Sequence, residues 1–264
     1  SQDPHRSGVA PGDGDVRDAE SLLLRGLVKP ADGIVSRNIN RRISTSLSRH
    51  LARRTVRPNH VTAVVCAIGV CAGPLAWLGT YAGFALGGLC YYVSAILDGC
   101  DGELARLKHL GSPLGAWLDT VVDDLVGLSW LVGMYLGLAR GPSPLAWWVM
   151  GGVAVPAYLL TVLPRYYLFA TGLGAGDHQK LAAASRSADP RGFARVVWAV
   201  RDVVFRTYFL PFAAFVTAAV GLVPVFAVPY AAGSVAAFAD TVGTVARFRR
   251  PKPADGSTTA QSRK

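Results

Sequence analysis

The sequence predicts an all-α integral membrane protein with six transmembrane helices, preceded by an N-terminal amphipathic helix at the membrane interface. Hydrophobic residues make up 51% of the 264 residues, and the mean hydropathy is +0.32. Both values are too high for an ordinary soluble domain of this length. A helix needs about 20 mostly apolar residues to span the hydrocarbon layer, and six stretches meet this requirement.

The chain before the first span divides into two parts. Residues 1–19 are rich in Gly, Asp and Ser, which predicts a disordered leader, and residues 20–57 form a cytoplasmic juxtamembrane segment. Within 33–56, apolar residues recur every four positions, at Ile39, Ile43, Leu47 and Leu51, and the arginines lie largely on the other faces of the helix. This pattern predicts an amphipathic helix in the membrane interface, with arginines near anionic headgroups. The alternative is a soluble helix packed on its own domain.

The six spans form a membrane domain over residues 58–250, and a disordered cytoplasmic tail follows over 251–264. Arg140 is the only one of the 27 Lys and Arg residues on the side that holds the loops near 80, 140 and 222. By the positive-inside rule, both termini are cytoplasmic, which predicts a protein of the cytoplasmic membrane. The spans are predicted at 60–79, 83–105, 114–138, 144–168, 199–220 and 223–247.

The net charge of +10 raises the question of nucleic-acid binding. The charges follow the membrane topology and flank no recognition motif, so no nucleic-acid partner is expected. The apolar stretches are expected to lie in the lipid bilayer.

Four aspartates interrupt the second and third predicted spans: Asp98, Asp101, Asp119 and Asp123. Each costs about 2.5–3.5 kcal/mol at a helix centre, so the four together oppose insertion by about 10 kcal/mol unless they are neutralised. Asp98 and Asp101 share a helix face, as do Asp119 and Asp123, so two neighbouring helices can direct four carboxylates into one pocket. Oxygen ligands suit Mg²⁺, Mn²⁺ or Ca²⁺. The alternative is a set of carboxylates paired with arginine, but only Arg106 lies near them in the sequence.

The pattern Asp98-x-x-Asp101-Gly102-x-x-Ala105-Arg106, followed by Gly115-x-x-x-Asp119-x-x-x-Asp123, resembles the motif of the CDP-alcohol phosphotransferase family at every defining position. Eight specified residues across 26 positions make a chance match very improbable. The resemblance covers residues 57–250 in hydropathy layout. It implies a six-helix membrane fold, two divalent metal ions, and transfer of a substituted phosphate from a CDP-linked donor to an acceptor hydroxyl, with release of CMP.

The resemblance also implies roles for the motif residues. Asp98, Asp101, Asp119 and Asp123 would hold the two ions, Mg²⁺ or Mn²⁺, and Asp123 would also take the acceptor proton as the catalytic base. A second group would border the cytidine and the diphosphate on the cytoplasmic side: Asp101, Gly102, Ala105, Arg106 and Gly115. For each glycine, helix packing is the alternative explanation. Asp124 is expected at the edge of the bundle, outside the motif.

Basic residues near the fourth span are candidates to hold a phosphate on the acceptor. Arg165 follows Pro164 in an otherwise apolar run, and Lys180 and Arg186 lie in the connection that follows. A guanidinium fork suits phosphate. The alternatives are that Arg165 snorkels to the interface and that the loop residues serve only as positive-inside charge.

A weaker resemblance concerns the segment before the first span. Residues 27–33 and 36–41 are similar to the segment that precedes the membrane domain in a subgroup including di-myo-inositol-phosphate phosphate synthases. There it commonly follows a cytidylyltransferase domain, which the polar residues before it here are too few to form. This likeness favours CDP-diacylglycerol or CDP-inositol as donor and an inositol phosphate as acceptor, with glycerol phosphate and serine left open.

Two other functions compete with this interpretation. Intramembrane prenyltransferases also bind metal and diphosphate through a D-x-x-x-D motif, but the Asp98–Arg106 pattern is not the partner motif that they need. A cation transporter could use buried acids as a relay, although it predicts repeats and broken helices, whereas these acids cluster in two spans. Glycines at four-residue spacing allow close helix packing, and a homodimer is compatible with them but not demonstrated.

Overall fold

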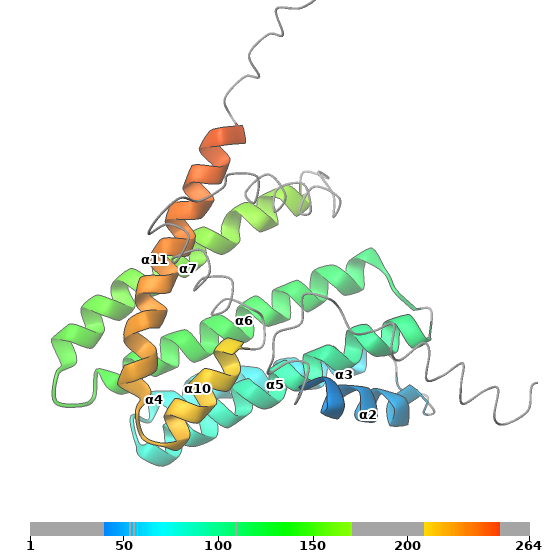
Figure 1. The fold of residues 1–264 in the computed structure, drawn as a ribbon, viewed down its shortest axis with the longest axis horizontal. Coiled ribbons are helices and arrows are strands. Elements are labelled where there is room, and N and C mark those ends of the chain that lie inside the picture. Colours follow the sequence, from blue (N-terminus) through cyan, green and yellow to red (C-terminus); the bar gives the residue numbers. More distant parts are fainter. Residues whose placement is uncertain are drawn as a thin grey trace, which may run out of the picture.

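The computed structural model describes residues 40–52, 54, 56, 58–108, 110–170 and 209–248, and the regular structure in these ranges is helical (Figure 1). Four stretches are long and apolar enough to cross a membrane: Pro58–Trp77, Tyr81–Leu107, Pro113–Leu138 and Pro144–Leu163. They agree with the first four predicted spans. The helices are α2 (Arg41–Ala52), α3 (Pro58–Val70), α4 (Ala72–Trp77), α5 (Tyr81–Leu107), α6 (Pro113–Leu138), α7 (Pro144–Ala170), α10 (Phe209–Ala219) and α11 (Val223–Phe248).

The fifth and sixth predicted spans are described only in part. Apolar helices of shorter length cover Phe209–Ala219 and Val223–Ala239, and residues 199–208 lie outside the described ranges. The count of six spans therefore stays a prediction. So do the disordered leader and tail, whose residues the structure does not describe.

The first predicted span is broken at Cys71, where α3 ends and α4 begins. Pro74 explains the break, because it has no N–H to donate to the carbonyl of Val70 one turn earlier. That carbonyl instead accepts a 2.8 Å hydrogen bond from the hydroxyl of Ser129 on α6. The break in α3–α4 is thus satisfied by a neighbouring helix, as buried backbone groups in a bilayer require.

The two helices that carry the aspartates begin at side-chain caps. Thr80 accepts from the N–H of Gly83 at 3.1 Å to start α5, and Ser112 accepts from the N–H of Gly115 at 3.0 Å to start α6. Pro113 follows Ser112 in the first turn, where its missing N–H costs nothing. These caps determine where each helix begins and therefore which turn presents each carboxylate.

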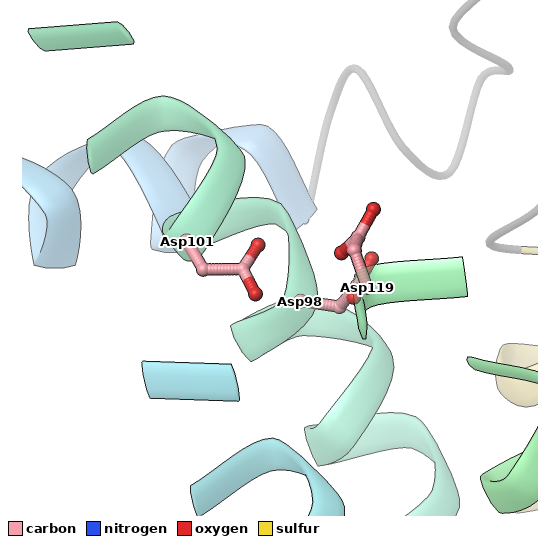
Figure 2. Close-up of side chains that lie close together, drawn as sticks. All are labelled: Asp98, Asp101 and Asp119. Atoms are coloured by element: carbon pink, nitrogen blue, oxygen red, sulfur yellow. The ribbon is translucent and has the colours of Figure 1, made fainter. Parts of the chain in front are cut away.

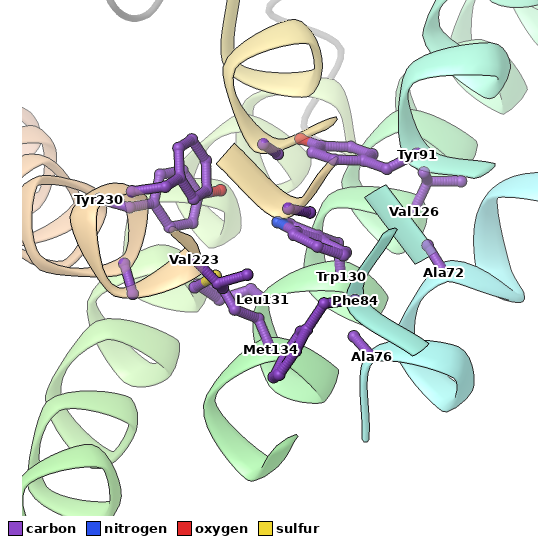
Figure 3. Close-up of a cluster of buried hydrophobic side chains, with 14 of the residues drawn as sticks. Ala72, Ala76, Phe84, Tyr91, Val126, Trp130, Leu131, Met134, Val223 and Tyr230 are labelled. Carbon is purple, nitrogen blue, oxygen red and sulfur yellow. The ribbon is translucent and has the colours of Figure 1, made fainter. Parts of the chain in front are cut away.

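The core lies between α4, α5, α6 and α11 (Figure 3). Trp130, Leu131 and Met134 of α6 are fully buried there. α4 and α6 approach through glycine: a Cβ on Gly133 would lie 2.1 Å from the backbone oxygen of Gly73. No larger residue fits at this crossing, so packing explains the glycine. α7 and α11 lie side by side, and α10 packs along α5 (Figure 1).

α2 lies against α5, within the stretch where an amphipathic helix is predicted. Leu47 and Leu51 of the predicted apolar stripe pack against the core, but serines share the contact face and Ile43 lies outside it. Ser44 and Ser48 are buried against α5, whereas Ile43 is 47% exposed. The hydroxyl of Ser44 donates to Oε1 of Glu103 at 3.0 Å, and that of Ser48 to the carbonyl of Cys100 at 3.4 Å. Small polar residues permit this close approach and leave Ile43 directed outward. An interfacial position of α2 remains a prediction.

Candidate active site

Three aspartates from two helices converge near one end of the bundle. Asp98 and Asp101 come from α5 and Asp119 from α6, and one carboxylate oxygen from each lies within 4.8 Å of the other two. Figure 2 shows the three side chains turned toward one another. The i, i+3 spacing places Asp98 and Asp101 on one face of α5, and the packing of α6 beside α5 brings Asp119 to them.

The environment of these carboxylates fits a divalent cation. Asp101 is 5% exposed, and the hydroxyl of Thr62 on α3 donates to its Oδ2 at 2.5 Å. Oδ1 of Asp98 is buried and has no hydrogen-bond partner within the described part of the chain. A buried carboxylate oxygen without a partner is costly, and a metal ion offsets that cost. The donor set contains only oxygen, which suits Mg²⁺ or Mn²⁺.

Asp123 is placed differently from the three converging aspartates. It lines a cavity of about 320 Å³ together with Asp98, one turn along α6 from Asp119. Asp101 is buried, Asp98 and Asp119 are half-buried, and Asp123 is exposed to this cavity. A substrate that enters the cavity can therefore reach the Asp123 carboxylate more readily than the carboxylate of Asp101.

The other motif residues lie on the same two helices. A Cβ added to Gly102 would meet no atom within 4 Å, so helix packing among the described residues does not explain this glycine. Ala105 is half-buried and Arg106 is exposed in the last turn of α5. Gly115 donates its N–H to the cap of α6, and a Cβ there would lie 3.1 Å from the Ser112 hydroxyl. Local capping thus accounts for part of the preference for glycine at 115.

The sequence predicts Asp124 at the edge of the bundle, but the structure places it on the cavity wall. It lines the same cavity as Asp123, and α7 reaches over to it. The hydroxyl of Tyr166 donates to Oδ2 of Asp124 at 3.1 Å, and that of Tyr158 lies 3.4 Å from Oδ1. The expected edge position is wrong because α7 packs over the side of α6 that carries Asp124. The sequence did not indicate either tyrosine, because Tyr158 and Tyr166 lie 34 and 42 residues from Asp124 along the chain.

The predicted acceptor-phosphate residues fall largely outside the described part of the chain. The backbone of Arg165 belongs to α7, but its side chain lies outside the described set, and Lys180 and Arg186 lie outside the described residues altogether. Arg165 directly precedes Tyr166, whose hydroxyl reaches the cavity at Asp124. This turn of α7 is therefore close to the candidate active site.

Comparison with known proteins defines the class of protein to which this fold and site belong. The family model of CDP-alcohol phosphatidyltransferase matches residues 55–239, which include α3 to α7, α10 and most of α11. The chain belongs to the CDP-alcohol phosphatidyltransferase family. The prediction of a CDP-alcohol phosphotransferase is confirmed at this level.

Curated relatives place the chain near one group within this family. The protein from Thermococcus kodakarensis, named bifunctional IPC transferase and DIPP synthase, is 38% identical over 153 residues, which are 58% of this chain and 33% of the relative. Relatives of the same name from Aquifex aeolicus and Archaeoglobus fulgidus are 33% identical over 134 residues and 34% identical over 142 residues. These matches cover 50% and 53% of this chain, and 30% and 28% of the relatives. The chain thus spans about a third of the length of the curated relatives that it matches.

Proposed function

We propose that the chain transfers a substituted phosphate from a CDP-linked donor to an acceptor hydroxyl and releases CMP. The observation that supports this function best is the convergence of Asp98, Asp101 and Asp119 beside a cavity in a membrane bundle. Bound between these carboxylates and Asp123, two divalent ions, Mg²⁺ or Mn²⁺, would neutralise the diphosphate and orient it. Asp101, Gly102, Ala105, Arg106 and Gly115 would border the cytidine diphosphate.

The transfer needs a base as well as a charge-neutralising site. The acceptor oxygen attacks the phosphorus that carries the donor's alcohol, the bond from that phosphorus to the oxygen of CMP breaks, and the acceptor loses its proton. Asp123 is suited to take this proton, because its carboxylate faces the cavity while Asp101 is buried and hydrogen-bonded to Thr62. The open space beside Gly102 leaves room for a ligand at the backbone of α5.

The acceptor that the relatives favour is an inositol phosphate. Their name, IPC transferase and DIPP synthase, agrees with the resemblance of the segment before α3 to di-myo-inositol-phosphate phosphate synthases. The donor that we propose is CDP-inositol or CDP-diacylglycerol. Arg165, with Lys180 and Arg186, would hold the acceptor phosphate. The placement of Lys and Arg supports a protein of the cytoplasmic membrane with this site and both termini on the cytoplasmic side.

A panel of donors and acceptors tests the proposal. The purified protein is supplied with CDP-inositol or CDP-diacylglycerol, with inositol phosphate, glycerol phosphate or serine, and with Mg²⁺ or Mn²⁺, and CMP is measured. We expect CMP release that needs both substrates and stops on chelation of the metal. Metal flux across vesicles without CMP release from any donor would contradict the proposal and favour a cation transporter.

A further inference from the structure

Behind the aspartates, the cavity continues into a group of tyrosine hydroxyls. Tyr91 of α5, Tyr158 of α7 and Tyr230 of α11 line it around Gly127 of α6, and these four residues are called the tyrosine pocket below. Tyr91 lies seven residues from Asp98, and Gly127 lies four from Asp123, so both are on the helix faces that carry the carboxylates. The tyrosine pocket therefore begins about one to two helix turns deeper in the bundle than the aspartates.

The side chains of Tyr91 and Tyr230 are buried, and their hydroxyl oxygens open onto the cavity. Tyr91 is 9% exposed and Tyr230 5%, and neither hydroxyl has a hydrogen-bond partner in the described part of the chain. A Cβ on Gly127 would lie 2.8 Å from the Tyr158 hydroxyl oxygen and 3.9 Å from that of Tyr91. Figure 3 shows the hydroxyl ends of Tyr91 and Tyr230 turned toward each other. The absent side chain at Gly127 leaves the space in which these groups meet.

The tyrosine rings are held in place by other aromatic side chains. Tyr91 stacks on the fully buried Trp130 with ring centroids 5.8 Å apart, and Tyr230 stacks on Phe226 at 5.3 Å. The rings of Tyr91 and Tyr230 are fixed, although their hydroxyls have no hydrogen-bond partner within the part of the chain that the structure describes. A pair of hydroxyls that is fixed at the cavity wall, without a partner among the described residues, is available to hydrogen-bond a ligand in the cavity.

The residues that line the tyrosine pocket indicate which class of ligand it can bind. A phenol hydroxyl both donates and accepts, which matches an alcohol group. Among the described residues no Lys or Arg lines the cavity, and the hydroxyls of Tyr91, Tyr158 and Tyr230 suit a neutral group better than an anion. An acyl chain would leave the hydroxyls unpaired. The whole cavity, including the part beside the aspartates, has a volume of about 320 Å³, which suits a small molecule.

We propose that the tyrosine pocket is a subsite for a neutral polyhydroxylated group, such as a cyclitol ring, of one of the two substrates. This inference rests on the proposed function and adds a substrate-recognition site to it. The ring can belong to the acceptor, whose reacting hydroxyl would then lie beside Asp123, or to the alcohol of the CDP-linked donor.

Phenylalanine variants test the subsite because they remove one hydroxyl and keep the ring. We expect Tyr91→Phe and Tyr230→Phe to raise the KM of the polyol substrate about three- to tenfold each, with little change in kcat or thermal stability. A raised acceptor KM assigns the ring to the acceptor. A raised KM for CDP-inositol but not for CDP-diacylglycerol assigns it to the donor. Tyr135→Phe is the control, because its buried hydroxyl binds the carbonyl of Ala227 at 2.7 Å and lies outside the cavity.

Two outcomes would overturn the subsite. Unchanged KM values in both Phe variants would show that the hydroxyls bind only water, and a loss of kcat matched by a loss of stability would show a structural role. If the wild type releases no CMP, the proposed function fails, and the subsite is then tested by unfolding in detergent with free myo-inositol. We expect this polyol to raise the Tm of wild type and Tyr135→Phe but not of Tyr91→Phe, and equal shifts would contradict the inference.

Discussion

The hydroxyl of Thr62 donates a 2.5 Å hydrogen bond to Oδ2 of Asp101 and so joins α3 to the carboxylate cluster on α5. The carbonyl of Pro58 lies farther from the same hydroxyl, at 3.3 Å, and a hydroxyl has one proton to donate. We therefore predict that Thr62 is a positioning residue, which orients the Asp101 carboxylate.

Thr62→Val should weaken the site while leaving the fold intact. The substitution keeps the shape of the side chain but removes the donor, so Asp101 loses the bond that orients it. We expect CMP release to fall about tenfold at low metal concentration and to recover partly at high concentration, because a hydrogen bond to a charged group contributes about 1.5–3 kcal/mol. Thr161→Val is the control, since that hydroxyl binds only the carbonyl of Ala157 in its own helix, at 2.8 Å. Equal metal dependence in the two variants would argue against a positioning role.

Asp98→Asn, Asp101→Asn and Asp119→Asn should each abolish CMP release and weaken metal binding. Each change replaces a charged oxygen by a neutral amide within the group whose oxygens lie within 4.8 Å. The measurement is calorimetric titration with Mn²⁺ beside CMP release. Glu103→Gln is the matched control on the same helix, because Glu103 is fully buried but bonds to Ser44 of α2. Activity within tenfold of wild type in any of the three Asn variants would contradict the assignment.

The buried serine face of α2 predicts how this helix is held. Ser44→Leu should separate α2 from α5 by overpacking, which typically costs about 1–3 kcal/mol. We expect a lower Tm in detergent for Ser44→Leu. Ser46→Leu should leave the Tm unchanged, since Ser46 is exposed and bonds only to the carbonyl of Arg42. An equal Tm in both variants would show that α2 does not depend on this contact.

The comparison of sequence and structure shows which features depend on local pattern. Hydropathy located the stretches that became α3 to α7, and i, i+3 spacing put Asp98 and Asp101 on one face. The sequence could not show that Ser129 satisfies the carbonyl freed by Pro74, or that Ser44 and Ser48 of α2 are buried against α5. These contacts join residues 52 to 59 positions apart on different helices. They depend on how the helices are aligned against each other, which a short-range sequence pattern does not show.

Arg165→Ala tests the acceptor-phosphate prediction. If the guanidinium of Arg165 pairs with a phosphate, its loss should cost about 1.5–3 kcal/mol, or roughly ten- to 150-fold in the KM of a phosphorylated acceptor. Arg140→Ala is the control, because Arg140 lies 5.1 Å above the ring of Trp77 at the opposite end of α6. An acceptor KM that is the same in both variants would show that Arg165 only snorkels to the interface.

Asp123→Asn should separate binding from catalysis. Asp123 is exposed to the cavity, whereas Asp98, Asp101 and Asp119 form the convergent group, so three carboxylates remain to hold the metal when Asp123 is changed. If Asp123 mainly accepts the acceptor proton, the variant should bind Mg²⁺ and CDP-donor with nearly wild-type affinity. Its turnover should nevertheless fall by about 10²–10⁴-fold, the range typical for loss of a general base. Calorimetric titration with Mg²⁺ and CDP-donor, beside single-turnover CMP release, measures both quantities. A donor affinity that falls in step with the rate would show that Asp123 is chiefly a metal ligand, and another group would then have to take the proton.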